Sequence, residues 1–363
     1  MAAVDRRSPT RTRPAKAPTI FDVAALAGVS KSTVSNVIRG VGGASEATRA
    51  RVNRAIDQLG YRPNIIARQL VHQRTNTIGV LAGNLDNPFH GEMATRVVQA
   101  ASQFGMTAVF YDIEGDGRLT LRSVEALLEQ HVAGIVFLAI FGSSPAIEYA
   151  VGGRVPVVFV GLREDWADSV AVDDHAATVL ATRHVIDLGH RRIAYLTTPG
   201  VERRTARGRA DGYRAAMRAA GLEPRPVVRW DPEHDRAGIG RGAPGPLAGE
   251  LVGPAAPTAI VCSNDLGAIA VLEVADRLRI SVPGQLSVVG FDNVHLAGLA
   301  RISLTTVSQP LDELARVGIE TVVARIQGRE NGPVRAVTLP AELVVRESTG
   351  RPRARQRPAA TAS

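Results

Sequence analysis

The sequence predicts a small helical N-terminal unit followed by an α/β core of two doubly wound parallel-sheet lobes. Three observations predict this fold class. Two short helical patterns, joined by a turn that contains glycine, occupy residues 19–40. From Thr77 onwards, short apolar runs alternate with helical stretches, which is typical of parallel sheets covered by helices on both faces. The chain has 363 residues, of which 45% are hydrophobic, so it is long enough for more than one lobe.

The first two helical patterns have the layout of a helix-turn-helix. Thr19 can act as the N-cap of the first helix, and the apolar residues that follow it recur at helical spacing. Gly28 stands where this helix must stop and the chain must turn, a position that favours the left-handed conformation of glycine. Ser30 can cap the second helix, whose Val34 and Val37 can turn inwards.

The polar face of the second helix predicts contact with DNA. An α-helix fits the major groove, where base edges differ in their donors and acceptors. Lys31 can donate to guanine, Asn36 can make a bidentate contact with adenine, and Ser32 can donate or accept. Arg39 and Thr33 are better placed for phosphates. In this part of the chain we expect DNA contacts from Thr19, Ser30, Lys31, Ser32, Thr33, Ser35, Asn36 and Arg39. The alternative is a helical hairpin with a solvated polar face.

A third helix and a short hinge follow. Val52, Ile56 and Leu59 repeat at helical spacing from Ser45, and Gly60 ends the pattern. Pro63 blocks continuation and can open a new helix over residues 65–70. A helix of that length is marginal in water because its nucleation is costly, so we expect it to fold only when it docks on DNA.

Residues 19–74 resemble the headpiece and hinge of the lactose-repressor family of bacterial transcription regulators. The matching elements are Asp22-Val23-Ala24, Ala27-Gly28-Val29-Ser30, Thr33-Val34-Ser35, Tyr61-Arg62-Pro63-Asn64 and Ala67-Arg68-Gln69-Leu70. The resemblance implies that two hinge helices pair in the minor groove and that a leucine from each, here Leu70, wedges between base pairs. It adds Asn64, Ala67, Arg68 and Leu70 to the predicted DNA contacts. An ordinary linker leucine is the alternative for Leu70.

The charge is concentrated where DNA binding is predicted. Residues 1–74 contain 13 Lys/Arg and 4 Asp/Glu, a net charge of +9, and residues 350–363 carry +4. The remainder carries −5, so the basic charge lies on the part that would neutralise phosphates. We expect disordered basic tails at 1–18 and 350–363, a headpiece at 19–62, a hinge at 63–76 and a core at 77–349. The tails either attract phosphates or are simply solvated.

Several classes of protein find no support. Cys262 is the one cysteine, so no intrachain disulfide is possible. The N-terminus is basic but lacks the apolar segment of a signal peptide, and no apolar run is long enough to span a membrane. We therefore expect a cytoplasmic protein without a membrane partner. No phosphate-binding loop, nucleophile elbow or metal-ligand spacing is present, so we expect no enzyme, no metal and no cofactor.

The core is expected to alternate strands and helices. The predicted strands are 78–82, 107–111, 134–140, 156–160, 170–172, 193–197, 259–262 and 287–290. The predicted helices are 91–104, 119–130, 175–188, 206–220 and 265–278. Residues 232–253 are rich in Gly and Pro, so any helix there is expected to be short or broken.

From Ile78 to Glu347 the sequence resembles the sugar-binding-protein-like core of the same family. The resemblance implies two lobes joined by three crossings, which we expect near 174, 305 and 335. The first lobe then comprises about 77–174 and 305–335, and the second about 175–304 and 336–349. An effector would bind between the lobes, at the carboxyl ends of the strands.

Polar residues at strand ends are the candidate effector contacts. Carboxylates, amides and guanidinium groups match vicinal hydroxyls, and an aromatic ring covers the apolar face of a sugar. The candidates are Phe89, Asp174, Arg203, Thr205, Arg209, Asn264, Asp265 and Asp292. The resemblance implies that Arg209 and Asp292 hold the ligand. Asp174 and Asp265 have a structural alternative, because each can cap the helix that follows it.

These observations predict an allosteric homodimer that binds palindromic operator DNA and a small sugar-like effector, most simply as a repressor. The same fold responding to a nucleoside or to a protein corepressor is an alternative. A solute-binding transport protein is a further one, which the headpiece argues against. Inducer and corepressor, activator and repressor, and dimer and tetramer stay open at this point, although the C-terminal tail lacks the leucine heptad of a tetramerising coiled coil.

Overall fold

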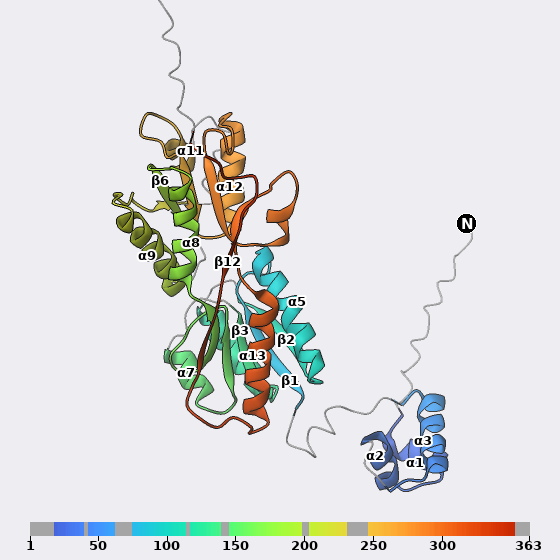
Figure 1. Cartoon of the computed structure of the whole chain (residues 1–363). Helices are drawn as coiled ribbons and strands as arrows, with labels where there is room; N and C mark the ends of the chain where they lie inside the picture. The colour runs from blue at the N-terminus through green and yellow to red at the C-terminus, as the bar shows by residue number, and fades with distance from the viewer. Residues whose placement is uncertain are drawn as a thin grey trace, which may run out of the picture. The chain divides into compact units, whose positions relative to one another are not determined.

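The structure is a computed structural model that describes residues 18–39, 43–61, 75–113, 117–138, 145–197, 203–230 and 246–352. These residues belong to two compact units, one within Met1–Thr75 and one within Asn76–Ser363 (Figure 1). Almost all of the predicted hinge and tails, and residues 231–245, lie outside the described residues. The predicted hinge contacts Asn64, Ala67, Arg68 and Leu70 are therefore sequence predictions only.

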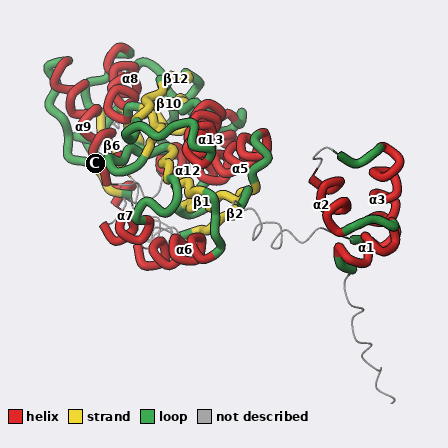
Figure 2. The backbone as a smooth tube through the Cα atoms, turned by 90° about the horizontal axis from the view of Figure 1, so that it is seen from below, coloured by secondary structure: helices red, strands yellow, loops and turns green. Residues whose placement is uncertain are grey.

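The described part of the first unit is a three-helix domain, consisting of α1 (Ile20–Ala27), α2 (Lys31–Arg39) and α3 (Glu46–Leu59) (Figure 2). Gly28 ends α1 in the left-handed conformation, with φ at 63°. The helices share one core of Val23, Ala24, Ala27, Val34, Val52 and Ala55. The predicted helix-turn-helix and third helix are confirmed.

The second unit contains two six-stranded sheets, and the first has the order β11-β5-β4-β3-β1-β2. All neighbouring strands in it are parallel. Its strands are β1 (Thr77–Ala82), β2 (Thr107–Asp112), β3 (Gly134–Leu138), β4 (Val157–Val160), β5 (Asp168–Val172) and β11 (Ala336–Leu339). Its helices are α5 (Pro88–Gln103), α6 (Gly117–Glu129), α7 (Pro145–Val151) and α13 (Leu311–Ile326).

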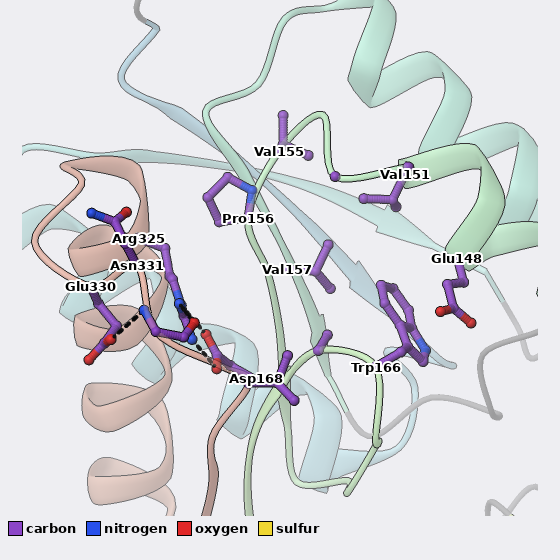
Figure 3. Close-up of a pocket in the computed structure, with 15 residues that line it drawn as sticks. Glu148, Val151, Val155, Pro156, Val157, Trp166, Asp168, Arg325, Glu330 and Asn331 are labelled. Carbon is purple, nitrogen blue, oxygen red and sulfur yellow. Dashed lines mark hydrogen bonds and ion pairs between the residues drawn. The ribbon is translucent and has the colours of Figure 1, made fainter.

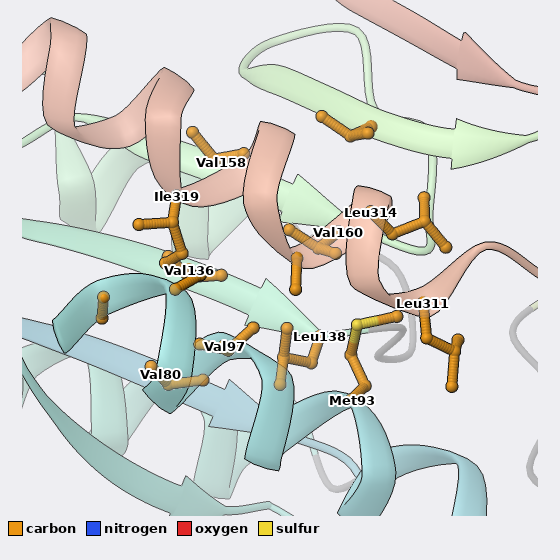
Figure 4. Packing of buried hydrophobic residues seen from close by; sticks show 14 of the residues in the cluster. Val80, Met93, Val97, Val136, Leu138, Val158, Val160, Leu311, Leu314 and Ile319 are labelled. Carbon is orange, nitrogen blue, oxygen red and sulfur yellow. The ribbon is translucent and has the colours of Figure 1, made fainter. Parts of the chain in front are cut away.

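Alternate residues of these strands point to opposite faces, and each face is covered by helices. Val80, Val136 and Val158 pack against α5 and α13, whereas Leu81, Ile135 and Val157 pack against α6 and α7. Figure 4 shows Leu311, Leu314 and Ile319 of α13 on the first of these faces. Gly318 allows α13 to lie close to the sheet, because a Cβ at this position would collide with Val160.

The second sheet has the order β12-β10-β9-β8-β6-β7. Its strands are β6 (Ile193–Thr197), β7 (Val228–Arg229), β8 (Ala259–Cys262), β9 (Ser287–Asp292), β10 (Thr305–Ser308) and β12 (Glu342–Val344). The edge strand β12 is antiparallel to β10, so this lobe departs from an all-parallel sheet. Its helices are α8 (Asp174–Asp187), α9 (Arg203–Ala219), α11 (Pro246–Leu251), α12 (Asp265–Arg277) and the 3-10 turn η1 (His295–Gly298). Residues of α8 and α9 pack on one face, and residues of α11 and α12 on the other.

The chain passes between the two sheets at 173, at 309–310 and at 340–341. The first crossing lies next to the expected position, but the expected crossings near 305 and 335 are a few residues too early. Residues 305–308 belong to the second lobe because β10 pairs with β9, and residues 336–339 belong to the first because β11 pairs with β5. Helix α13 (Leu311–Ile326) is absent from the predicted helices, although Leu311, Leu314 and Ile319 repeat there at helical spacing.

Candidate functional site

Helix α2 presents a polar face on the first unit. Buried Val34 anchors the helix in the core, while Lys31 and Ser32 at its start are exposed. Thr33, Ser35 and Asn36 are half-exposed, and Arg39 ends the helix. The Lys31 ammonium lies 5.1 Å from the ring centroid of Phe21, a cation–π distance that orients the lysine without neutralising its charge.

Two of the predicted DNA contacts have a structural task as well. The Thr19 hydroxyl accepts from the Asp22 amide at 3.4 Å, and the Thr19 amide donates to the Asp22 carboxylate at 2.7 Å. The Ser30 hydroxyl accepts from the Thr33 amide at 3.1 Å. Both hydroxyls therefore cap helix starts, and a helix start is also where backbone N–H groups favour a phosphate.

The second unit gathers a charged cluster where β6, β8 and β9 end. Arg209 of α9 is 6% exposed, and its Nε donates to Asp174 Oδ1 at 2.7 Å. Its Nη1 donates to the Ser263 carbonyl oxygen and lies 3.8 Å from Asp292 Oδ1. The centre of the guanidinium lies 3.6 Å from the ring centroid of Phe291. One buried cation thus faces two carboxylates and one aromatic ring.

The cluster has more acidic than basic groups, and the pKa values of its carboxyl groups are raised. Burial raises the pKa of Asp174, although Arg209 pulls it down. Burial also raises the pKa of Asp292 to about 8, against the opposing pull of Arg209 and with a further upward push from Asp265. Asp292 has a φ of 120°, a strained conformation for a residue with a side chain. Strain and shifted carboxyl groups collected in one place are typical of a binding site.

The structure separates the predicted effector residues into two groups. Asp174, Arg209 and Asp292 come together in the cluster, and Thr205 joins them through a side-chain hydrogen bond to Asp174. Arg203 opens α9, the helix that carries Arg209.

The other predicted effector residues have structural roles. Asn264 caps α12, accepting from the Gly267 amide at 2.9 Å. Asp265 is fully buried, where it accepts from Thr306 at 2.5 Å and from the Val294 amide at 2.9 Å. Phe89 is 5% exposed and packs in the core of the first lobe.

Gln309 is a cluster residue that the sequence analysis missed. Its Nε2 donates to Asp292 Oδ1 at 2.8 Å, and it lies on the second crossing between the lobes. It is also a polar residue directly after a strand, which was the criterion for the other candidates. The strand before it, β10, contains two threonines and a serine, so no apolar run predicts it.

Two hollows lie elsewhere on the second unit. One, of about 640 Å³, is lined by the end of α7, the starts of β4 and β5 and the segment after α13 (Figure 3). The other, of about 780 Å³, lies along α8, α9 and the third crossing. Within the described ranges, no cluster of three potential metal ligands occurs and no helix is long and apolar enough to cross a membrane.

A helix-turn-helix unit on one chain with a two-lobed α/β core defines a DNA-binding regulator with a ligand-binding module. The chain belongs to the lacI family of bacterial regulatory proteins, whose model matches residues 19–64. A periplasmic binding protein-like domain matches residues 182–349.

Relatives extend over nearly the whole chain. The chain is 34% identical to the HTH-type transcriptional regulator DegA of Bacillus subtilis, over 91% of this chain and 98% of that protein. It is 36% identical to the ribose operon repressor of Escherichia coli, over 85% of this chain and 93% of that protein. The crystal structure of the lac repressor dimer bound to operator and an anti-inducer matches with a TM-score of 0.80 and 27% identity. The match covers 92% of this chain and 100% of that chain. The chain is thus a transcriptional regulator, and the relatives named here are regulators rather than enzymes.

Proposed function

We propose that the protein is a homodimeric repressor that binds a palindromic operator and is controlled by a small sugar-like effector held by Asp174, Arg209 and Asp292. The single observation that carries the effector assignment is the buried Arg209 between two carboxylates, with Phe291 beneath it. Guanidinium and carboxylate groups bind vicinal hydroxyls by charge-assisted hydrogen bonds.

On the DNA side, Lys31, Ser32 and Asn36 read bases in the major groove, while Thr33 and Arg39 contact phosphates. The exposure of Lys31 and Ser32 at the start of α2 supports this assignment, because the N-terminal residues of a recognition helix reach base edges. One such unit reads half a site, so two copies arranged about a two-fold axis match a palindrome. The hinge leucine Leu70 wedges between base pairs at the centre.

Two relatives support a sugar as the effector. One is named a ribose operon repressor, and the CelR regulator, whose structure is a cellobiose complex, matches with a TM-score of 0.64 and 32% identity. A nucleoside is a second candidate class, because its ribose carries vicinal hydroxyls that the same side chains can bind. The effector acts by favouring one arrangement of the lobes, and its differential affinity for the two arrangements sets the change in operator binding.

The operator assignment is tested by binding of the full-length protein to sites that it selects from a random duplex library. We expect a palindromic consensus. Asn36→Ala should relax preference at one base position per half-site, with a loss of about 1–3 kcal/mol, whereas Leu70→Ala should weaken all sites. Equal affinity of wild-type protein and Leu70→Ala would count against the wedge, and a lack of any consensus would contradict operator binding.

The effector class is tested by thermal shift over a panel of pentoses, hexoses, disaccharides and nucleosides. A true effector raises the melting temperature of the wild-type protein by mass action. The same compound should leave the melting temperature of the Arg209→Met variant unchanged. A shift from nucleosides alone would select the second class, and a shift that Arg209→Met retains would place the ligand elsewhere.

A further inference from the structure

A groove of about 780 Å³ lies on the second unit, apart from the Arg209 cluster. Its walls come from α8, α9 and residues 338–341, and it includes none of Arg209, Phe291 and Asp292. Figure 1 shows α8 and α9 side by side in the second lobe. The volume falls within the range of small-molecule sites, which runs from about 300 to 1,000 Å³.

The groove reaches both lobes. Helices α8 and α9 pack on the second sheet, whereas Thr338 and Leu339 belong to β11 of the first sheet. Asp173 and Pro340, which also line the groove, lie on the first and third crossings. A molecule bound here therefore touches two of the three connections about which the lobes reorient.

Small side chains leave the groove open. Gly212 lets the two helices approach, because a Cβ there would collide with the carbonyl oxygen of His175. The walls between the helices are then mostly alanine, from Ala176, Ala177, Ala215, Ala216 and Ala219. Leu180 also lines the groove and is 43% exposed, so apolar surface remains uncovered.

The charge at the rim favours an anion. Arg183 lines the groove, is exposed and has no acceptor among the described residues. The carboxylate of Asp173 is the only acidic group in the lining that the structure describes, and it accepts from the Ala176 amide at 2.9 Å as the cap of α8. An apolar floor with one unpaired guanidinium complements a ligand that has an apolar body and a single carboxylate.

We propose that this groove binds a small monocarboxylic acid with an apolar body, and that the bound acid shifts the orientation of the two lobes. The regulatory part of this proposal rests on the proposed function, because lobe orientation matters only if it controls the operator-binding form. The binding part does not depend on DNA. Coupling between two sites of one protein commonly changes affinity by about 5- to 150-fold, and we expect a change in operator affinity within that range.

Binding is tested on the full-length protein by calorimetric titration with hexanoate, benzoate and phenylacetate, with hexanamide and benzamide as uncharged counterparts. We expect saturable binding of at least one acid at about 1 mM or tighter, and weaker binding of its amide. Arg183→Gln should weaken binding of the acid at least about tenfold, because one charged hydrogen bond is lost. Arg218→Gln on α9, an exposed arginine outside the groove, is the matched control and should bind like wild type.

A second variant, Ala219→Leu, fills the groove at an exposed helical position and should abolish binding of the acid without loss of folding. The acid and the compound that stabilises the wild-type protein in the thermal-shift panel should bind one molecule together without displacing each other, which separates this site from the proposed effector site. Competition between the acid and a sugar effector for one site would overturn the proposal. An equal loss of affinity for the acid in Arg183→Gln and Arg218→Gln would also overturn it. So would an absence of saturable binding for all three acids.

Discussion

Each lobe holds an aspartate–arginine pair with a buried member, and the pairs differ in how completely they are satisfied. In the first lobe, Arg325 binds both oxygens of Asp168, at 2.8 and 2.9 Å, and Asp168 also accepts from the Arg335 amide at 2.7 Å. The remaining guanidinium donors reach the carbonyl oxygens of Gly332 and Pro333. This pair has one cation for one anion, and its hydrogen bonds link the loop after α13 to the start of β5.

In the second lobe, Arg209 shares its charge between Asp174 and Asp292, and its face lies on Phe291. The excess of carboxylates over cations means that burial is not fully compensated, so the pKa of Asp292 rises to about 8. The comparison teaches that burial of an ion pair does not by itself indicate function. A closed one-to-one pair is costly to break, whereas an unbalanced cluster at strand ends retains capacity to bind a ligand.

The largest expected effect is on stability, at the closed pair. Asp168→Ala leaves the Arg325 guanidinium without its carboxylate in a site where Asp168 is 3% exposed, so we expect a loss of about 3–5 kcal/mol in the free energy of unfolding. Urea denaturation of the full-length protein measures it. Glu320→Ala, which breaks the exposed Arg316–Glu320 pair on the same helix, is the control and should cost about 0.5 kcal/mol or less. Equal losses in the two variants would remove the distinction between closed and exposed pairs.

The next effect is a pH dependence of stability at the Arg209 cluster. The pKa of Asp292 is raised from 3.8 to about 8 in the folded protein, so its contribution is fully present below about pH 4 and is lost as the pH rises through 8. Asp292→Asn has no such loss. Its stability relative to wild type should rise between pH 4 and 8, by at most about 1.4 kcal/mol per pH unit, and then level off. A stability difference that does not change with pH would contradict an unbalanced cluster.

The smallest effect concerns a pair between the lobes. The Glu92 carboxylate of α5 accepts from the backbone amide of His295 and from the Nδ1 of the His295 ring, both at 2.8 Å. This contact joins the first lobe to η1 of the second. The His295 side chain is 67% exposed, so Glu92→Gln should change stability by less than about 1 kcal/mol. It should instead alter the effector concentration at which operator binding changes, measured by a fluorescence titration. No change in either quantity would show that this contact does not restrain the lobes.

Much of this architecture could be predicted from local sequence. The helix-turn-helix follows from Thr19, Gly28 and Ser30, because capping and turn residues act over a few positions and leave a direct signature. The apolar strands of both sheets follow in the same way from runs such as 259–262. The fold class required only these signals and the alternation of strands with helices.

The crossings and the composition of the cluster could not be predicted in full. Whether residues 305–308 join one sheet or the other depends on pairing with β9, a contact between distant segments that leaves no local pattern. The same holds for Asp265, which looks like an exposed strand-end ligand in sequence but is buried against Thr306. Gln309 follows β10, a four-residue strand with two threonines and a serine that no apolar run predicts.

The most direct test of the central claim is a titration of the selected operator with wild-type protein and Arg209→Met, each with and without the compound that stabilises wild type in the thermal-shift panel. We expect the compound to change the operator affinity of the wild-type protein by about 5-fold or more, while Arg209→Met binds the operator and does not respond. An undiminished response in Arg209→Met would show that the Asp174–Arg209–Asp292 cluster is not the effector site.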